Sequence, residues 1–378
     1  MAEGTQAARR LASARRVVVK IGSSLLLARG RLRRAWLARL AEDAAALQAS
    51  GRGLLLVTSG AVGLGRKTFG TPRGLAERQA AAAVGQVRLA EAFRRALARA
   101  GLDSAQILLT PGDTEDRRRH LNARATLEAL LARSIVPVIN ENDTVATEEL
   151  KFGDNDRLAA RVAQLVSADL AVLLSDVDGL YDKDPQLFPE ARHIPEIRKI
   201  TPTIEAMAGG PGSALGTGGM ASKIAAARIA LAAGTTMAIA DGRAPGALGA
   251  FLAGARASWF LPTLEPLTAR KAWIAATVAP KGTLRLDAGA VAALHQGKSL
   301  LAVGATAAEG RFERGDPVRL LGPDGAPLGI GLVNYGARET GLILGKRSRD
   351  IPALLGYDGP DTLVHRDNLV PQGERVPA

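Results

Sequence analysis

The chain has 378 residues, of which 47% are hydrophobic and 23% charged, so its composition is that of a globular protein of about two domains. It has no cysteine, which excludes disulfides, thiolate metal sites and cysteine nucleophiles and favours a cytoplasmic setting. Its four histidines are scattered, which argues against a histidine-rich metal site, and no apolar run is long enough to predict a membrane span.

The net charge of +12 is concentrated at one end of the chain. Residues 1–39 hold ten Lys or Arg and one acidic residue, whereas the rest of the chain is close to neutral. This distribution predicts a basic N-terminal arm over residues 1–13, solvated and poorly ordered, rather than a basic face for nucleic acid.

After the arm, short apolar runs alternate with helical segments. The runs expected to form strands are 17–21, 54–57, 107–109, 136–139, 170–174 and 237–240. The segments expected to form helices are roughly 35–49, 75–99, 121–133, 154–167 and 220–233. Because the strands are continuously apolar, the pattern predicts a doubly wound α/β domain with a mostly parallel sheet over residues 14–256.

The pattern changes after residue 256. Prolines and the lack of a clear period predict a linker over 257–280. From Lys281 onward, glycine turn signals recur every 8–12 residues, which is typical of short strands. We therefore expect a small β-rich domain over 281–365 and a loose tail over 366–378.

Small polar residues and glycines follow five of the expected strands. In a parallel sheet, ligands bind beyond the carboxyl ends of the strands, and helices that begin there offer free N–H groups to anions. Ordinary helix capping would use the same residue types. Five such ends together favour a phosphate site: Lys20-Ile21-Gly22-Ser23-Ser24, Thr58-Ser59-Gly60-Ala61, Asn140-Glu141-Asn142-Asp143, Ser175-Asp176 and Asp241-Gly242.

Two further clusters precede helices. Residues 151–156 combine a lysine, a glycine and three side-chain acceptors, and residues 216–223 form a glycine-rich loop that enters a helix carrying Lys223. The second loop lacks Walker A spacing, and no strand precedes it, so a dinucleotide site is not favoured. Only 10 of the 49 basic residues are lysine, which makes Lys20 and Lys223 informative.

In combination, these motifs resemble the amino acid kinase family. The resemblance follows chain order and covers the segments 18–24, 57–61, 137–143, 152–156 and 216–223. Residues 281–358 resemble a PUA domain, which implies a small β-rich barrel. The departures are Ser23, where threonine is common, and the long basic arm before Arg15. The branch that this combination resembles phosphorylates the side-chain carboxylate of L-glutamate with ATP, the first step of proline biosynthesis.

The resemblance also implies roles for individual residues. Lys20 and Lys223 are expected to be catalytic, with Asp156 orienting both, and Mg²⁺ is expected on the ATP phosphates rather than on a protein metal site. The residues implied for ATP are Lys20, Gly22, Ser23, Ser175, Asp176, Thr217, Gly218, Gly219, Met220, Ala221, Ser222 and Lys223. Those implied for glutamate are Ser59, Gly60, Asp143 and Asn155.

The family implies feedback inhibition by proline and a homo-oligomer. The alternatives are a kinase of the same fold that acts on N-acetylglutamate, aspartate or a nucleoside monophosphate, and an RNA-binding protein that acts through the PUA-like domain. Residues 281–378 carry 12 basic and 11 acidic residues, so a strong electrostatic footprint for RNA is missing. We therefore expect a structural or regulatory role for that domain.

Overall fold

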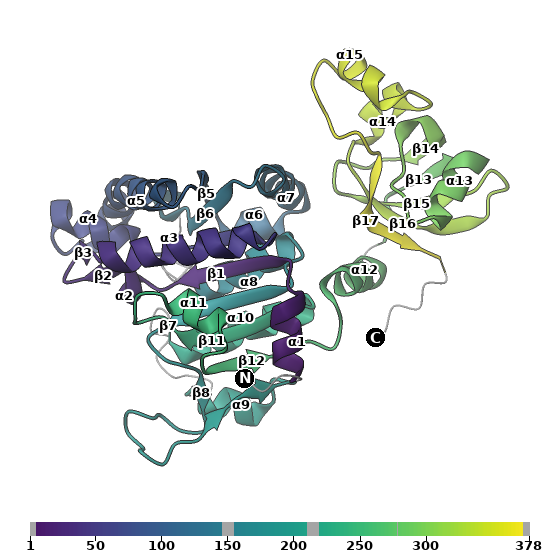
Figure 1. Ribbon diagram of the computed structural model, residues 1–378. Coiled ribbons are helices and arrows are strands. Elements are labelled where there is room, and N and C mark those ends of the chain that lie inside the picture. Colours follow the sequence, from purple (N-terminus) through teal and green to yellow (C-terminus); the bar gives the residue numbers. More distant parts are fainter. Residues whose placement is uncertain (1–4, 146–154, 210–218, 278, 373–378) are drawn as a thin grey trace. The chain divides into compact units, whose positions relative to one another are not determined.

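The computed structural model describes residues 5–145, 155–209, 219–277 and 279–372. The chain forms two compact units, Met1–Pro266 and Leu267–Ala378, and each is described by itself (Figure 1). Among the described residues, no helix is both long enough and apolar enough to cross a membrane.

The first unit is built on an eight-stranded sheet with the order β10-β12-β11-β7-β1-β4-β6-β5. All neighbouring strands are parallel except β11 and β12. The predicted doubly wound, mostly parallel sheet is thus confirmed. Its strands are β1 (Arg16–Ile21), β4 (Gly53–Val57), β5 (Ser104–Leu109), β6 (Val136–Glu141), β7 (Leu170–Ser175), β10 (Glu196–Ile197), β11 (Thr236–Asp241) and β12 (Ala257–Phe260).

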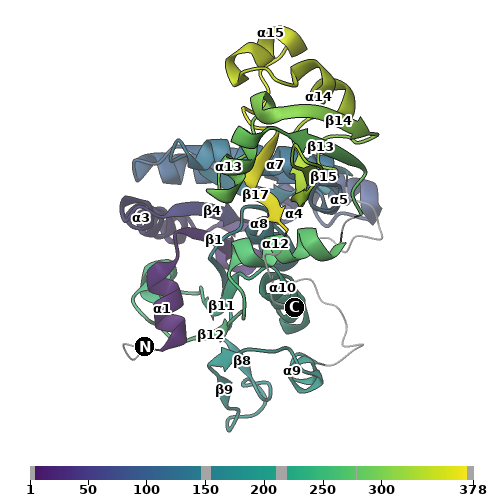
Figure 2. The same cartoon turned by 90° about the vertical axis from the view of Figure 1, so that its right-hand side faces the viewer.

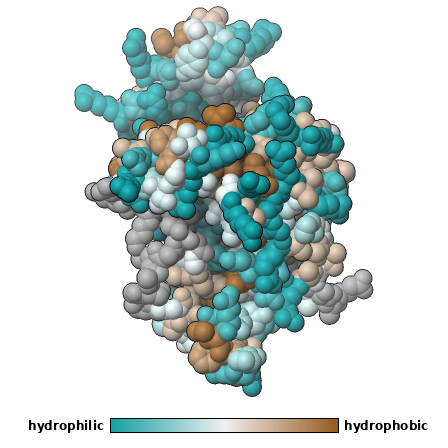
Figure 3. All heavy atoms as spheres, turned by 90° about the vertical axis from the view of Figure 1, so that its left-hand side faces the viewer, coloured by the Kyte–Doolittle hydropathy of each residue, from teal (hydrophilic) through white to brown (hydrophobic). Residues whose placement is uncertain are grey.

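Strand β1 lies in the middle of the sheet; β4, β5 and β6 form one half of the sheet before β7 begins the other half. In open sheets that reverse direction in this way, ligands bind beyond the carboxyl ends of the strands at the point of reversal. Figure 3 views the molecule from the side on which β1 ends, where hydrophilic side chains cover much of the surface.

Helices cover both faces of the sheet (Figures 1 and 2). Val17 and Val19 of β1 belong to the core beneath helices α3 (Arg34–Ala49), α5 (Gly74–Arg99) and α11 (Ala247–Leu252). Val18 belongs to the core beneath α7 (Arg117–Leu131), α8 (Asn155–Leu165) and α10 (Met220–Ala232). Because side chains alternate along a strand, Lys20 lies on the same face as Val18, toward α8 and α10.

The shorter elements of the first unit connect these layers. They are α2 (Ser23–Leu26), β2 (Leu27–Ala28), β3 (Arg31–Leu32), α4 (Ala61–Phe69), α6 (Pro111–Glu115), η1 (Asp143–Val145), β8 (Leu180–Tyr181), β9 (His193–Ile194) and α9 (Pro202–Met207).

The N-terminal arm differs from the prediction. Helix α1 (Gln6–Ser13) forms there, and it buries Ala7 and Leu11 in the core of the first unit. Arg10 pairs with Glu265. The charge count predicts a solvated arm because it does not register that Ala7 and Leu11 share one helical face.

The segment predicted as a linker also holds regular structure. Strand β12 adds to the sheet of the first unit, and helix α12 (Pro266–Thr277) follows it. Proline suits the first position of a helix, since its missing N–H would have no partner there. Pro266 therefore marks the start of helix α12 as well as the boundary between the units.

The second unit holds a five-stranded sheet with the order β14-β13-β15-β16-β17, which confirms the predicted small β-rich domain. Strand β17 runs to Pro371, so the predicted tail at 366 begins within a strand whose Leu369 and Val370 are buried. The elements are β13 (Gly282–Leu286), α13 (Ala288–His295), η2 (Ala302–Gly304), β14 (Ala305–Gly310), β15 (Pro317–Leu321), β16 (Pro327–Val333), α14 (Ala337–Ile343), η3 (Ser348–Asp350), α15 (Ile351–Leu355) and β17 (Val364–Pro371).

Helices α4 and α5 cross with their backbones in contact. A Cβ atom on Gly65 would lie 1.8 Å from the carbonyl oxygen of Ala81, and one on Gly85 would lie 1.7 Å from that of Ala61. Neither position can accept a side chain unless the helices separate. This contact fixes where α4 begins, at the end of β4, and holds the middle of α5 beside it.

Replacing Gly85 with Ala should therefore lower the free energy of unfolding by about 1–3 kcal/mol, the usual cost of overpacking. Chemical denaturation followed by circular dichroism measures this change. Gly112→Ala in α6 is the control, because a Cβ there meets only the Thr110 hydroxyl oxygen at 3.7 Å. Equal stability of the two variants would contradict the inferred helix contact.

Candidate active site

The centre of the site is one carboxylate between two ammonium groups. Asp156 Oδ1 lies 2.5 Å from Lys20 Nζ, and Asp156 Oδ2 lies 3.2 Å from Lys223 Nζ. The three residues are only 6%, 1% and 4% exposed in the order Lys20, Asp156, Lys223. They come from β1, α8 and α10, so residues far apart in the chain meet beyond the central strand of the sheet.

The electrostatics of this cluster keep its carboxylate ionised. Burial alone would raise the pKa of Asp156, but the ammonium groups of Lys20 and Lys223 outweigh it and hold that pKa below its usual value. Two buried ammonium groups at one place are suited to an anion that carries several negative charges.

The first turn of α10 adds further groups. Gly219 is the N-cap, Met220 and Ala221 follow it, and the Ser222 hydroxyl donates to Asp156 Oδ2 at 3.3 Å. The first N–H groups of a helix have no acceptor within the helix, so this turn presents donors next to the two lysines. Thr217 and Gly218, also expected here, lie outside the described residues, as does the cluster 151–154.

Two turns follow the central strands. Gly22 caps α2, which begins at Ser23, and a Cβ on Gly22 would lie 3.9 Å from Lys20 Nζ. Gly60 caps α4 with a φ of 107°, a left-handed conformation that favours glycine. The Ser59 hydroxyl donates to the Ile21 carbonyl at 3.3 Å, which ties the two turns together.

Asn155, the residue before Asp156, is held by its amide nitrogen. Its Nδ2 donates to the Thr58 carbonyl at 2.8 Å and to Asn140 Oδ1 at 3.1 Å. Its Oδ1 is buried and has no donor among the described residues. A buried acceptor without a partner is costly, so this oxygen is suited to an N–H or ammonium group of a ligand.

Asp143 lies just beyond the end of β6, in η1. Burial, with a smaller contribution from the carboxylate of Glu141, raises the pKa of Asp143 to about 7. A carboxylate that is costly to ionise gains from pairing with a cation. Asp143 is therefore suited to an ammonium group.

Ser175 and Asp176 lie at the end of β7, where the Ser175 hydroxyl donates to Asp176 Oδ1 at 3.0 Å. On the neighbouring strand end, Arg243 donates to both oxygens of Asp241 and lowers the pKa of that carboxyl. Arg243 was not among the predicted site residues. The sequence signal was present, because the arginine follows Asp241-Gly242 directly.

Asn140 and Gln86 were also not predicted as site residues. Asn140 Nδ2 donates to Gln86 Oε1 at 2.7 Å, which links Asn155 to helix α5. Asn140 belongs to a predicted polar strand end, whereas nothing in the sequence around Gln86 distinguishes it from any helical glutamine.

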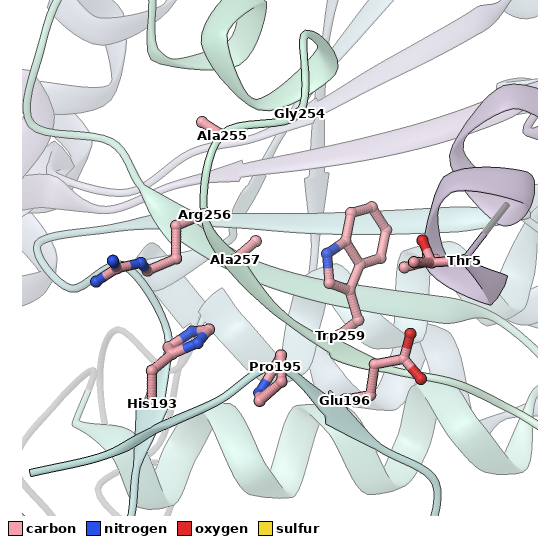
Figure 4. Close-up of a pocket in the computed structure, with 10 residues that line it drawn as sticks. Thr5, His193, Pro195, Glu196, Gly254, Ala255, Arg256, Ala257 and Trp259 are labelled. Atoms are coloured by element: carbon pink, nitrogen blue, oxygen red, sulfur yellow. The ribbon is translucent and has the colours of Figure 1, made fainter. Parts of the chain in front are cut away.

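A cavity of about 390 Å³ lies elsewhere in the first unit, lined by Thr5, His193, Arg256 and Trp259 among others (Figure 4). None of the strand-end residues above lines it. His193 is held there by the Ser258 hydroxyl, 3.1 Å from its Nε2. The cavity therefore lies apart from the lysine cluster.

Comparison with known proteins assigns families to both units. The model of the amino acid kinase family matches residues 15–241, and that of the PUA domain matches residues 282–355. Curated relatives match over nearly the whole chain. A protein named glutamate 5-kinase from Paramagnetospirillum magneticum is 56% identical over 96% of this chain and 99% of its own length.

Two other relatives bear the same name. The one from Jannaschia sp. is 58% identical over 95% of this chain and 99% of its own length. The one from Paracoccus denitrificans is 52% identical over 96% of this chain and 98% of its own length.

Replacing Asp156 with Asn should remove the carboxylate charge that both ammonium groups share and lower the free energy of unfolding by about 3–5 kcal/mol at pH 7. Because the native pKa of Asp156 is lowered, its contribution is present above the ordinary value of 3.8 and is lost as the pH falls through the native pKa. The difference in the free energy of unfolding between Asp156→Asn and the parent protein should therefore become smaller below about pH 4.

Urea denaturation over a pH series measures this effect. Asp103→Asn, at an exposed position in the same unit, is the control. A constant difference at every pH would show that Asp156 does not stabilise the fold through its charge.

Proposed function

Because the chain belongs to the amino acid kinase family, we propose that it transfers the terminal phosphoryl group of ATP to the side-chain carboxylate of L-glutamate. The products are ADP and L-glutamyl 5-phosphate, the first step of proline biosynthesis. The observation that carries the proposal is the meeting of Lys20 and Lys223 at Asp156. The names and coverage of the curated relatives support the choice of glutamate.

The chemistry needs charge stabilisation rather than a general base. The acceptor carboxylate is already ionised at neutral pH and attacks without losing a proton. The difficulty is to bring an anion to a polyphosphate and to stabilise the charge on the moving phosphoryl group, and both are electrostatic tasks. A buried pair of ammonium groups is suited to both.

The proposed roles divide between the two lysines. Lys20 holds oxygens of the transferring phosphate, and Lys223 stabilises the transition state and the leaving group. Asp156 orients both ammonium groups through its two oxygens. The remaining residues proposed for ATP are Gly22, Ser23, Ser175, Asp176, Thr217, Gly218, Gly219, Met220, Ala221 and Ser222.

The donors of this site also fit magnesium-bound ATP. Ammonium groups and helix N-termini bind phosphate oxygens and leave others for a cation, and Mg²⁺ prefers phosphates and water to a protein cage. The phosphates of ATP would hold Mg²⁺, which would supply further charge neutralisation there.

For glutamate, we assign the α-ammonium group to Asp143 and to the Oδ1 atom of Asn155. Ser59 and Gly60, at the start of α4, complete the proposed set. The family relation further supports feedback inhibition by proline, a homo-oligomeric state and a cytoplasmic location.

The experiment that tests this function measures ADP release by a coupled assay, with ATP, Mg²⁺ and one acceptor at a time. Glutamate should support turnover, and N-acetylglutamate and aspartate should not, because they lack the free ammonium group or the longer side chain. Addition of proline tests the inhibition. Turnover with N-acetylglutamate or aspartate, but not with glutamate, would overturn the assignment.

Replacing Lys223 with Ala should lower kcat by a factor of about 10²–10³, the cost of losing one group that stabilises transition-state charge. The KM for glutamate should change little, because Lys223 does not contact that substrate in our assignment. Steady-state kinetics with both substrates varied measures the two effects. Lys199→Ala, at an exposed position, is the control, and near-normal kcat in Lys223→Ala would refute the role.

Glutamate use should depend on pH through Asp143. The carboxyl must be ionised to pair with the ammonium group, and its pKa is raised to about 7. As the pH falls through 7, kcat/KM for glutamate should therefore fall while the KM for ATP stays constant. In Asp143→Ala, the glutamate KM should be much higher and this pH dependence should vanish; a change confined to the ATP KM would show that the role is misplaced.

A further inference from the structure

Three side-chain amides form a continuous chain from helix α5 to the first residue of α8. Asn140 Nδ2 donates to Gln86 Oε1 at 2.7 Å, and Asn155 Nδ2 donates to Asn140 Oδ1 at 3.1 Å. Asn155 Nδ2 also donates to the Thr58 carbonyl at 2.8 Å. Asn140 and Asn155 are almost completely buried, and Gln86 is half-buried.

The direction of every amide in this chain follows from the Thr58 carbonyl. A carbonyl oxygen can only accept, so Asn155 must present its nitrogen to it. The two hydrogens of that nitrogen are then used by Thr58 and Asn140. Asn140 must present its oxygen to Asn155 and its nitrogen to Gln86, which must supply an oxygen.

This direction leaves the oxygen of Asn155, not its nitrogen, for a ligand. That oxygen is buried and has no donor among the described residues. A ligand that satisfies it must bring a hydrogen-bond donor. In the proposed reaction, the donor is the α-ammonium group of glutamate.

Gln86 is well placed to support this arrangement. It follows Gly85, where the backbone of α5 contacts that of α4, so its backbone position is fixed by packing. Helix α5 also packs against η1, the turn that carries Asp143. Gln86 thus belongs to the helix that packs against the turn of Asp143, and its side chain reaches Asn155 through Asn140.

We infer that Gln86 is a positioning residue, which acts through Asn140 to hold the oxygen of Asn155 toward the α-ammonium group of the amino acid substrate. This inference rests on the proposed function. Without an acceptor at position 86, the Asn140 amide loses the partner that fixes its direction, and the hold on Asn155 weakens.

The test compares Gln86→Met, which keeps the size of the side chain and removes the acceptor, with Gln86→Glu, which keeps an oxygen at the same place. In Gln86→Met the KM for glutamate should rise about five- to tenfold, as expected for the loss of one hydrogen bond. The KM for ATP and kcat should stay within about twofold. Gln86→Glu should restore most of the glutamate affinity.

Glutarate separates positioning from packing, because it is glutamate without the α-amino group. Its inhibition constant against glutamate should be the same in Gln86→Met and in the parent enzyme. The matched control is Gln48→Met, the same change at a glutamine whose side chain donates to the Ser134 carbonyl at the surface. Thermal melting of all variants verifies folding.

The inference is overturned if Gln86→Met binds glutamate normally, if glutarate and glutamate weaken equally, or if Gln86→Glu is as impaired as Gln86→Met. A parent enzyme that phosphorylates glutamate normally, together with any of these results, would refute only the role of Gln86. A parent enzyme inactive on glutamate in the same assay would refute the proposed function and, with it, this inference.

Discussion

The site depends on one buried carboxylate that separates two ammonium groups. Without Asp156, Lys20 and Lys223 would lie close together with like charges, in a place where water cannot screen them. With it, the two ammonium groups are held at different oxygens of one carboxyl group. Two ammonium groups held at one point in this way are suited to the oxygens of a phosphate group.

The topology of the sheet makes this meeting possible. Strand β1 occupies the point at which the winding reverses, so the groups at its carboxyl end lie where open sheets of this kind bind ligands. The alternation along the strand then turns Lys20 toward α8 and α10 rather than toward α3 and α5. A shift in the register of β1 by one residue would place Lys20 on the other face of the sheet, away from Asp156 and Lys223.

The sequence predicts most of this arrangement, since buried parallel strands are continuous apolar runs and their ends carry the polar residues. It does not predict a role for Gln86, because the role of a helical glutamine depends on its hydrogen-bond partner, and Asn140 lies far from Gln86 in the sequence. It also misses helix α1 and the continuation of β17 past residue 365, since charge and proline content conceal apolar spacing at chain ends. Local sequence patterns thus indicate where the site residues lie. Contacts between distant parts of the chain determine which other residues orient their side chains.

The groups proposed to bind glutamate and those proposed to bind phosphate are connected at two consecutive residues. Asn155 belongs to the amide chain that reaches through Asn140 to Gln86, and Asp156 belongs to the lysine cluster. Their Cα atoms are necessarily about 3.8 Å apart, and both lie in the first turn of one helix. The substrate held by Asn155 and the phosphate held by the two lysines at Asp156 are therefore both positioned by the first turn of helix α8. Phosphoryl transfer needs the reacting atoms within about 3–3.5 Å, and a helix that carries both anchors keeps their separation constant when either ligand binds first.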